Sequence, residues 1–204
     1  MTGTDAHRWL AAAGESEIAR ELESVFAATA AAIEERGPAC WASGRCCNFE
    51  KSGHRLYVTG LETAYALSRL PAERAIGTSD MERAIAGGGC PFQVANLCGI
   101  HAIKPLGCRV YFCDRSAQQW QQELSELMLA RIRALHERFE VPYAYGEWRG
   151  LLAMVLEAMP RGTTMSDGSL AGDVTTSDPT AGVPIEGVST IGLPVIPAPR
   201  RPQI

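Results

Sequence analysis

Seven cysteines are the residues of this 204-residue sequence that could do chemistry, and all of them lie in its middle portion. Thiolates bind zinc, and they bind iron in iron–sulfur clusters. Cysteines that only fill a core would be spread more widely, and an odd number leaves one thiol over in any set of disulfides. The pattern therefore predicts a metal centre with ligands drawn from the following residues: Cys40, Cys46, Cys47, Cys90, Cys98, Cys108 and Cys113.

The cysteines form two groups, one ending in the neighbours Cys46 and Cys47 and the other spanning residues 90–113. Glycine and proline occur beside both groups, which suits loops that turn sharply to aim several sulfurs at one point. Two adjacent cysteines would serve two neighbouring metals or different faces of a cluster. The sequence has no CxxC pair and no bacterial ferredoxin run, so the spacing argues against common zinc scaffolds and leaves the metal open.

Helical spacing of apolar residues predicts the elements that must position these thiols. We expect helices over residues 16–36, about 60–69 and about 146–159, with a shorter one beginning near Asp80. A long helix should begin at Asp114 or Ser116 and end before Pro142. Residues 56–58 suit a short strand, and residues 90–113 should be loop-rich. The fold class predicted is therefore mostly α, a small helical domain with a loop-rich cysteine metal site.

Two regions follow from composition. Residues 1–159 are predicted to form a helical, cysteine-cluster metal-binding domain whose core motif is 40–113. Residues 160–204 hold seven of the twelve prolines, many Gly, Ser and Thr residues and no aromatic residue. Such a composition cannot bury enough apolar surface to fold, so a disordered C-terminal tail is expected.

Charge and hydropathy exclude several classes of protein. The net charge of -4 gives no basic footprint for nucleic acid. No apolar run approaches the roughly 20 residues that cross a bilayer. The first residues lack the pattern of a secretory signal, so a reducing cytoplasmic location is expected. In that compartment clustered cysteines are more often metal ligands or redox thiols than disulfides. Another protein is the partner class that remains open.

The cysteine segment resembles the YkgJ-like cysteine-cluster family of zinc- or iron-chelating domains, which includes flagellin lysine N-methylases. The family pattern is CxxCxxCC, an acidic residue opening a helix, CPF, a cysteine followed by Ile-Tyr, then Arg-Pro, then CR with an aromatic residue. The matching residues, in order, are 40–47, 59–62, 90–92, 98–101, 104–105 and 108–113.

The sequence departs from the family pattern at three positions. Ser43 stands where the pattern has its second cysteine, His101 replaces tyrosine, and Lys104 replaces arginine. The first group has thus lost one thiolate. The remaining thiols still exceed the four that one cluster or one zinc ion needs.

The function expected is a metal-binding protein that holds an iron–sulfur cluster, 4Fe–4S, through four of the seven cysteines. The resemblance to the flagellin methylases implies iron more than zinc. Cys46, Cys90, Cys98 and Cys108 are the first choices as ligands, with Cys40, Cys47 and Cys113 close behind. A structural zinc domain that binds another protein is one alternative. A modifying enzyme, such as a protein lysine N-methylase, rests on the resemblance alone, and a redox switch at the vicinal pair ranks last.

Several other residues receive an expected role. Arg109 should balance the charge of the thiolates together with Lys104. Tyr111 and Phe112 should shield the centre, whereas Glu62 should cap a helix with Thr59 rather than act as a base. The histidines are assigned mostly non-ligand roles: packing or a hydrogen bond to a ligand for His101, solvent for His54, and a surface or boundary position for His136.

Overall fold

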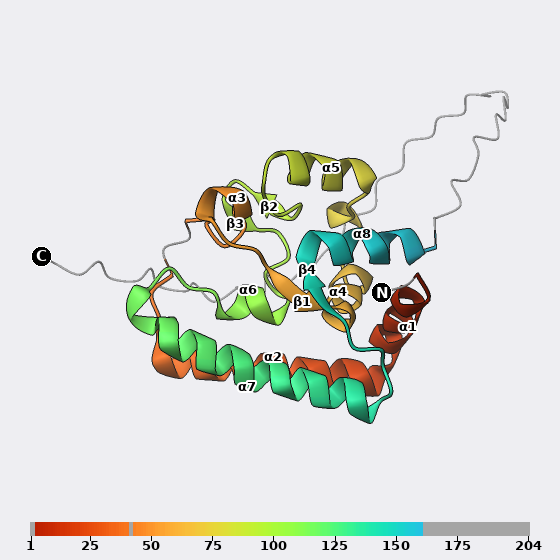
Figure 1. The fold of residues 1–204 in the computed structure, drawn as a ribbon, viewed down its shortest axis with the longest axis horizontal. Helices are drawn as coiled ribbons and strands as arrows, with labels where there is room; N and C mark the ends of the chain where they lie inside the picture. Colours follow the sequence, from red (N-terminus) through yellow and green to blue (C-terminus); the bar gives the residue numbers. More distant parts are fainter. Residues whose placement is uncertain (1–2, 41–42, 161–204) are drawn as a thin grey trace, which may run out of the picture. The chain divides into compact units, whose positions relative to one another are not determined.

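Helices account for most of the residues that the structure, a computed structural model, describes: 3–40 and 43–160 (Figure 1). The prediction of a mostly α domain is confirmed. Among these residues, no helix combines the length and the apolar character that crossing a membrane requires. The expected tail lies outside the described residues from 161 onward, and that expectation stays a prediction.

Two long helices lie antiparallel along one side of the domain (Figure 1). They are α2 (Ser16–Arg36) and α7 (Gln118–Arg138). Helix α2 ends where predicted, because Gly37 adopts the left-handed conformation and its N–H bonds to the Ile33 carbonyl. The inward stripe of α7 is buried at Leu124, Met128 and Ile132. Both helices contact the short α6 (Leu106–Val110), which carries Cys108.

A second group of helices forms the rest of the core. Helix α1 (Gly3–Gly14), which the sequence reasoning did not predict, packs on α4 (Gly60–Ser68) and on α8 (Trp148–Ala158). Trp9 of α1 is fully buried, and a Cβ atom on Gly60 would lie 2.3 Å from its indole. Only glycine therefore allows the first turn of α4 to touch this ring.

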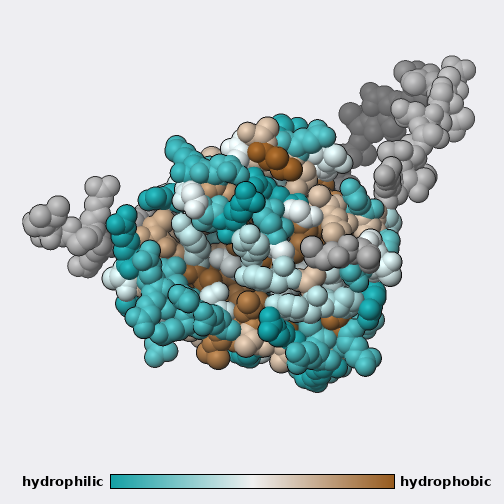
Figure 2. Space-filling view, in the orientation of Figure 1, coloured by the Kyte–Doolittle hydropathy of each residue, from teal (hydrophilic) through white to brown (hydrophobic). Residues whose placement is uncertain are grey.

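The strands are short and join distant parts of the chain. Strand β1 (Tyr57–Thr59) pairs antiparallel with β4 (Tyr145–Glu147), so that Val58 faces Gly146. Strands β2 (Gln93–Val94) and β3 (Leu97–Cys98) form a hairpin. On the face shown in Figure 2, hydrophobic side chains gather in a band across the middle, between mostly hydrophilic ones.

The remaining elements are short helices on either side of the cysteine groups. They are α3 (Phe49–Ser52), the 3-10 helix η1 (Ala72–Arg74), α5 (Thr78–Ala86) and the 3-10 helix η2 (Arg115–Ala117). The long helix therefore does not begin at Asp114 or Ser116 itself. Asp114 caps η2 by accepting from the Ser116 N–H, and α7 follows.

Residues 90–113 are loop-rich, as expected, with the β2–β3 hairpin and α6 within them. Two local expectations are corrected. His136 is 1% exposed rather than at the surface, since it faces the chain reversal after α7. His54 is half-buried rather than solvated, and its ring stacks on Tyr111 at 4.7 Å between centroids.

Candidate metal centre

Loops and turns hold most of the cysteines, while Cys98 ends β3 and Cys108 lies in α6, and backbone hydrogen bonds tie the two groups together. The Cys90 N–H donates to the Cys47 carbonyl at 2.8 Å. Gly44 turns the chain with a positive φ, and its carbonyl accepts from the Cys47 N–H and from the Gln93 side chain. These bonds fix the start of the second group against the first. Two segments that lie far apart in sequence therefore meet at one place.

Four thiols meet around Cys47. Its sulfur lies 4.0 Å from the sulfur of Cys46, and the thiols of Cys90 and Cys98 are close enough to raise its pKa. The neighbouring residues 46 and 47 thus turn their side chains toward the same point. Cys47 and Cys90 are buried, whereas Cys46 and Cys98 are half-buried. The four sulfurs define what we call the inner thiol group: Cys46, Cys47, Cys90 and Cys98.

Protonation differs sharply within the inner thiol group. The hydrogen bond from the Cys47 thiol lowers the pKa of Cys46 to about 6 and that of Cys98 to about 6, with Lys104 adding to both effects. The same bond lowers the pKa of the buried Cys90. The pKa of Cys47 is raised, because its proton is shared with these neighbours. Thiolates, not thiols, bind metals, so the lowered pKa values of Cys46, Cys90 and Cys98 favour ligation, whereas the raised pKa of Cys47 does not.

The remaining three cysteines lie around this group. Cys108 of α6 interacts electrostatically with Cys46, Cys90 and Cys98, and burial raises its pKa. Cys40 is exposed, and the Cys113 sulfur lies 3.5 Å from the Ser43 hydroxyl. Ser43 therefore stands beside a thiol at the position where the family pattern has a cysteine.

All seven cysteines are free thiols. Within residues 3–40 and 43–160, no group of three or more His, Cys, Asp or Glu side chains has an arrangement that could hold a metal ion. The predicted ligands are therefore brought together as mutually hydrogen-bonded thiols. Their donor chemistry, sulfurs with lowered pKa values and two cations nearby, fits a thiolate-bound metal.

A cavity of about 490 Å³ opens on the cysteines from the side of α2. Tyr111 and Phe112 line it, in keeping with their expected shielding role. So do His101, Lys104 and Arg109. Five of the seven cysteines contribute to its wall: Cys40, Cys46, Cys98, Cys108 and Cys113. The predicted residues thus converge on one hollow, with Cys47 and Cys90 buried behind it.

Lys104 and Arg109, the two cations expected to balance thiolate charge, both line the 490 Å³ cavity. The Lys104 ammonium is 3.0 Å from Nε2 of His101, and it lowers the pKa of His101. The Arg109 guanidinium stacks over the Phe26 ring at 4.1 Å and donates to the Ala102 carbonyl at 2.9 Å. Neither cation forms an ion pair with a carboxylate in the described part of the chain; Arg109 interacts electrostatically with Tyr65 and Glu62 as well as with Cys108 and Cys98.

Glu62 has a larger role than the sequence indicated. The capping box with Thr59 is present, as predicted. The other oxygen of the Glu62 carboxylate accepts a hydrogen bond at 2.7 Å from the N–H of Leu106, the first residue of α6. Burial raises the pKa of Glu62, while the hydrogen bonds from Thr59 and Leu106 lower it. This carboxylate therefore joins α4 to the helix that carries Cys108, a long-range contact that sequence spacing cannot reveal.

Two aromatic groups near the thiols were also missed. The buried Trp148 indole N–H has no hydrogen-bond partner by distance and angle, yet it lies close enough to Cys90 to lower the pKa of that thiol, although Trp148 looked like simple core from its helical spacing. His54 packs edge-on against Phe49 and stacks on Tyr111. The available signal was the position of His54 soon after the Cys46–Cys47 pair, but its polar sequence neighbours indicated a solvent-exposed loop.

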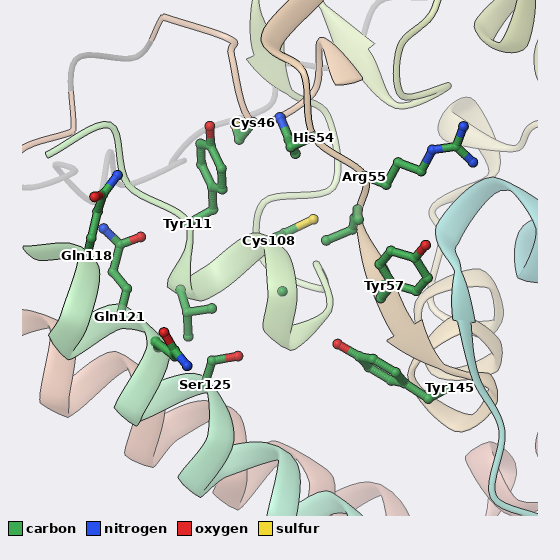
Figure 3. A pocket seen from close by; sticks show the side chains of 14 residues that line it. Cys46, His54, Arg55, Tyr57, Cys108, Tyr111, Gln118, Gln121, Ser125 and Tyr145 are labelled. Carbon is green, nitrogen blue, oxygen red and sulfur yellow. The ribbon is translucent and has the colours of Figure 1, made fainter. Parts of the chain in front are cut away.

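A second cavity, of about 320 Å³, reaches the cysteines from between α7 and the β1–β4 pair. Figure 3 shows the Cys108 side chain near its middle, with Cys46 and His54 at one end and Tyr57 and Tyr145 at the other. Comparison of the chain with protein-family models, with curated proteins and with solved structures found no match. The site must therefore be interpreted from its own residues.

Proposed function

We propose that the protein binds an iron–sulfur cluster through thiolates drawn from the inner thiol group and Cys108. The observation that carries the proposal is the meeting of Cys46, Cys90 and Cys98 around Cys47. These residues come from separate loops, and packing alone would not require four sulfurs to share one point. When bound, such a cluster supplies one-electron redox chemistry or Lewis acidity.

The charge of the surroundings supports the same proposal. A centre ligated by four thiolates is net negative, and buried negative charge is costly unless it is compensated. Lys104 and Arg109 stand on the side of the cavity and interact electrostatically with Cys46, Cys98 and Cys108. The Trp148 N–H beside Cys90 adds a donor of the kind that tunes thiolate ligands.

A structural zinc site is the second candidate, and one distance favours it. Zinc–sulfur bonds of about 2.3 Å in a tetrahedron place two sulfurs roughly 3.8 Å apart. The sulfurs of Cys46 and Cys47 are 4.0 Å apart. A protein with such a closed site would act through binding another protein rather than through the metal.

Anaerobic purification followed by a visible spectrum and elemental analysis tests both candidates. We expect a brown protein that carries iron and acid-labile sulfide. A colourless protein with stoichiometric zinc would replace the first candidate with the second, and a protein with neither metal would refute both.

Serine variants test the ligand set. Cys90→Ser should lose the metal and much of the thermal stability, because metal affinity is part of the folding energy at such sites. Cys40→Ser is the matched control, since Cys40 is exposed and lies outside the inner thiol group. Full metal content and a native melting curve in Cys90→Ser would show that the ligand assignment is wrong.

The enzymatic alternative has its own test. The 490 Å³ cavity has room for part of a substrate beside the thiols. Calorimetric titration of the metal-loaded protein with S-adenosylmethionine should give heat if the protein is a methylase of the resembled kind. Absence of heat at millimolar concentration would remove that alternative.

A further inference from the structure

The smaller cavity is walled by two stacked pairs of aromatic rings. His54 and Tyr111 stack at 4.7 Å with 22° between their planes, and Tyr57 and Tyr145 stack at 5.9 Å with 29°. The second pair follows from strand register, because Tyr57 faces Glu147 and Tyr145 lies two residues away on the same face. Figure 3 shows the two pairs at opposite ends of the cavity.

The rings at the strand end are open to a ligand. Tyr57 is 46% exposed and Tyr145 is 47% exposed, although each already packs against the other. Large apolar ring surface left uncovered beside a hollow is typical of a binding site. The faces and edges of these rings favour a flat ring over a branched or spherical group.

Polar groups without partners face the same space. The Ser125 hydroxyl extends from α7 toward the Tyr145 end of the cavity, whereas Gln118 lines the other end, beside Tyr111 (Figure 3). Neither side chain hydrogen-bonds to any other part of the described chain. By contrast, Gln121 is occupied with the backbone of Phe112. The available groups can donate and accept, so they suit the polar edge of a ring.

The charges of the residues that line the cavity restrict the chemical class of its ligand further. No carboxylate lines this cavity among the described residues, and Arg55 at its margin is exposed. A cationic ligand would thus find no carboxylate, and an anionic ligand would find one solvated guanidinium. About 320 Å³ is small for a ligand site, with room for one single or fused ring and little more.

We propose that this cavity binds an uncharged planar heteroaromatic ring of nucleobase size. The ring would lie against Tyr57 and Tyr145 and would direct its hydrogen-bonding edge toward Ser125, which lies at the same end of the cavity (Figure 3). Cys46, Cys108 and Tyr111 line both cavities, so the bound ring would lie next to the thiols. The claim that the ring lies beside a metal rests on the proposed function, whereas the claim that the cavity binds a ring does not.

Saturation-transfer NMR of the full-length protein with adenine, uracil and nicotinamide tests the inference. At least one ring should show saturable binding, whereas glucose and tetramethylammonium should bind more weakly. Base–aromatic stacking predicts that Tyr145→Ala weakens binding between about 5-fold and about 150-fold. Tyr143→Ala is the matched control, because Tyr143 is exposed in the same loop, packs on His136 and does not line the cavity.

Two further variants keep the test decisive. Tyr145→Phe should retain binding, because it keeps the ring. Ser125→Ala removes one hydroxyl from a half-buried position on α7 and keeps the helix, and it should weaken binding about 2-fold to 10-fold. Lack of binding by every ring at millimolar concentration would overturn the inference. Equal weakening in Tyr143→Ala and Tyr145→Ala, or a preference for glucose or tetramethylammonium, would also overturn it.

Metal analysis of the same samples separates the two proposals. A protein without metal that still binds a ring would refute the proposed function and leave this inference standing. A protein with a full iron–sulfur centre that binds no ring would support the proposed function and overturn this inference.

Discussion

The helical frame and the cysteine region are held together by different physical means. In the frame, large side chains such as Trp9, Trp148 and Leu61 are fully buried, and burial over a wide area fixes their positions. In the cysteine region, single backbone bonds and thiol contacts position half-buried groups. The frame should therefore lose stability gradually as contacts are removed. The cysteine region should depend on a few individual atoms.

Truncation of Trp9 gives the largest effect expected on the frame alone. Trp9→Ala would leave a cavity against Gly60 and remove the indole N–H bond to the Pro142 carbonyl. We expect a loss of about 3 to 5 kcal/mol in the free energy of unfolding, measured by urea denaturation. The metal content of the protein that remains folded should not change. Trp120→Ala, at a half-buried site on α7, is the control and should cost much less. A loss of metal from folded Trp9→Ala would show that the two regions are not separable.

Glu62 is the point where the two regions are joined, so its removal should affect both. Glu62→Ala leaves the Leu106 and Thr59 N–H groups without their acceptor. Buried donors without partners predict a loss of about 3 kcal/mol in the free energy of unfolding. Metal affinity should fall as well, because α6 carries Cys108. Thermal melting and metal titration check the two effects, and an unchanged metal affinity would assign Glu62 to the frame only.

His136 should make the stability of the frame depend on pH. Burial lowers the pKa of His136, so the folded protein favours the neutral ring. Below about pH 6.5 the unfolded chain binds more protons than the folded one. The contribution of His136 is thus complete above that pH and is lost as the pH falls. The urea midpoint should drop less between pH 7 and pH 5 in His136→Gln than in the unmodified protein. Parallel pH profiles would contradict this assignment.

The smallest effect is expected at the rim of the cysteine region. Ser43→Cys places a cysteine beside Cys113, whose sulfur lies 3.5 Å from the present hydroxyl. Under reducing conditions the free energy of unfolding should change by less than about 0.5 kcal/mol. In air the variant should form one disulfide, measured by thiol counting, because the two groups already touch. Loss of metal in the reduced variant would show instead that this rim belongs to the centre.

Sequence reasoning succeeded where local patterns decide the structure. The helices over 16–36 and 60–68, the capping box at Thr59 and the glycine stop at Gly37 all depend on neighbours in the chain. It failed where distant contacts decide. Helix α1 was not predicted, because it is short and its alanine-rich face is buried only by contact with α4 and α8, which are distant in sequence.

The site was predictable in its members and not in its arrangement. The cysteine types and spacing indicated which thiols would gather, and the inner thiol group agrees with most of the expected ligands. The second bond of Glu62, the stack of His54 on Tyr111 and the cavity between α7 and β1 all join residues far apart in sequence. No periodicity or motif encodes such encounters.

The bond between the Cys90 N–H and the Cys47 carbonyl has an evolutionary consequence. This bond joins the two ends of the segment 47–90, which includes α4 and α5. The positions of the sulfur atoms therefore do not depend on the length of that segment. Closing a longer loop adds little entropic cost per residue. Helix α5 buries only Met81 among its residues. Insertions, deletions or a fused reporter at α5 would therefore leave the thiols in place, and lineages are free to diversify there.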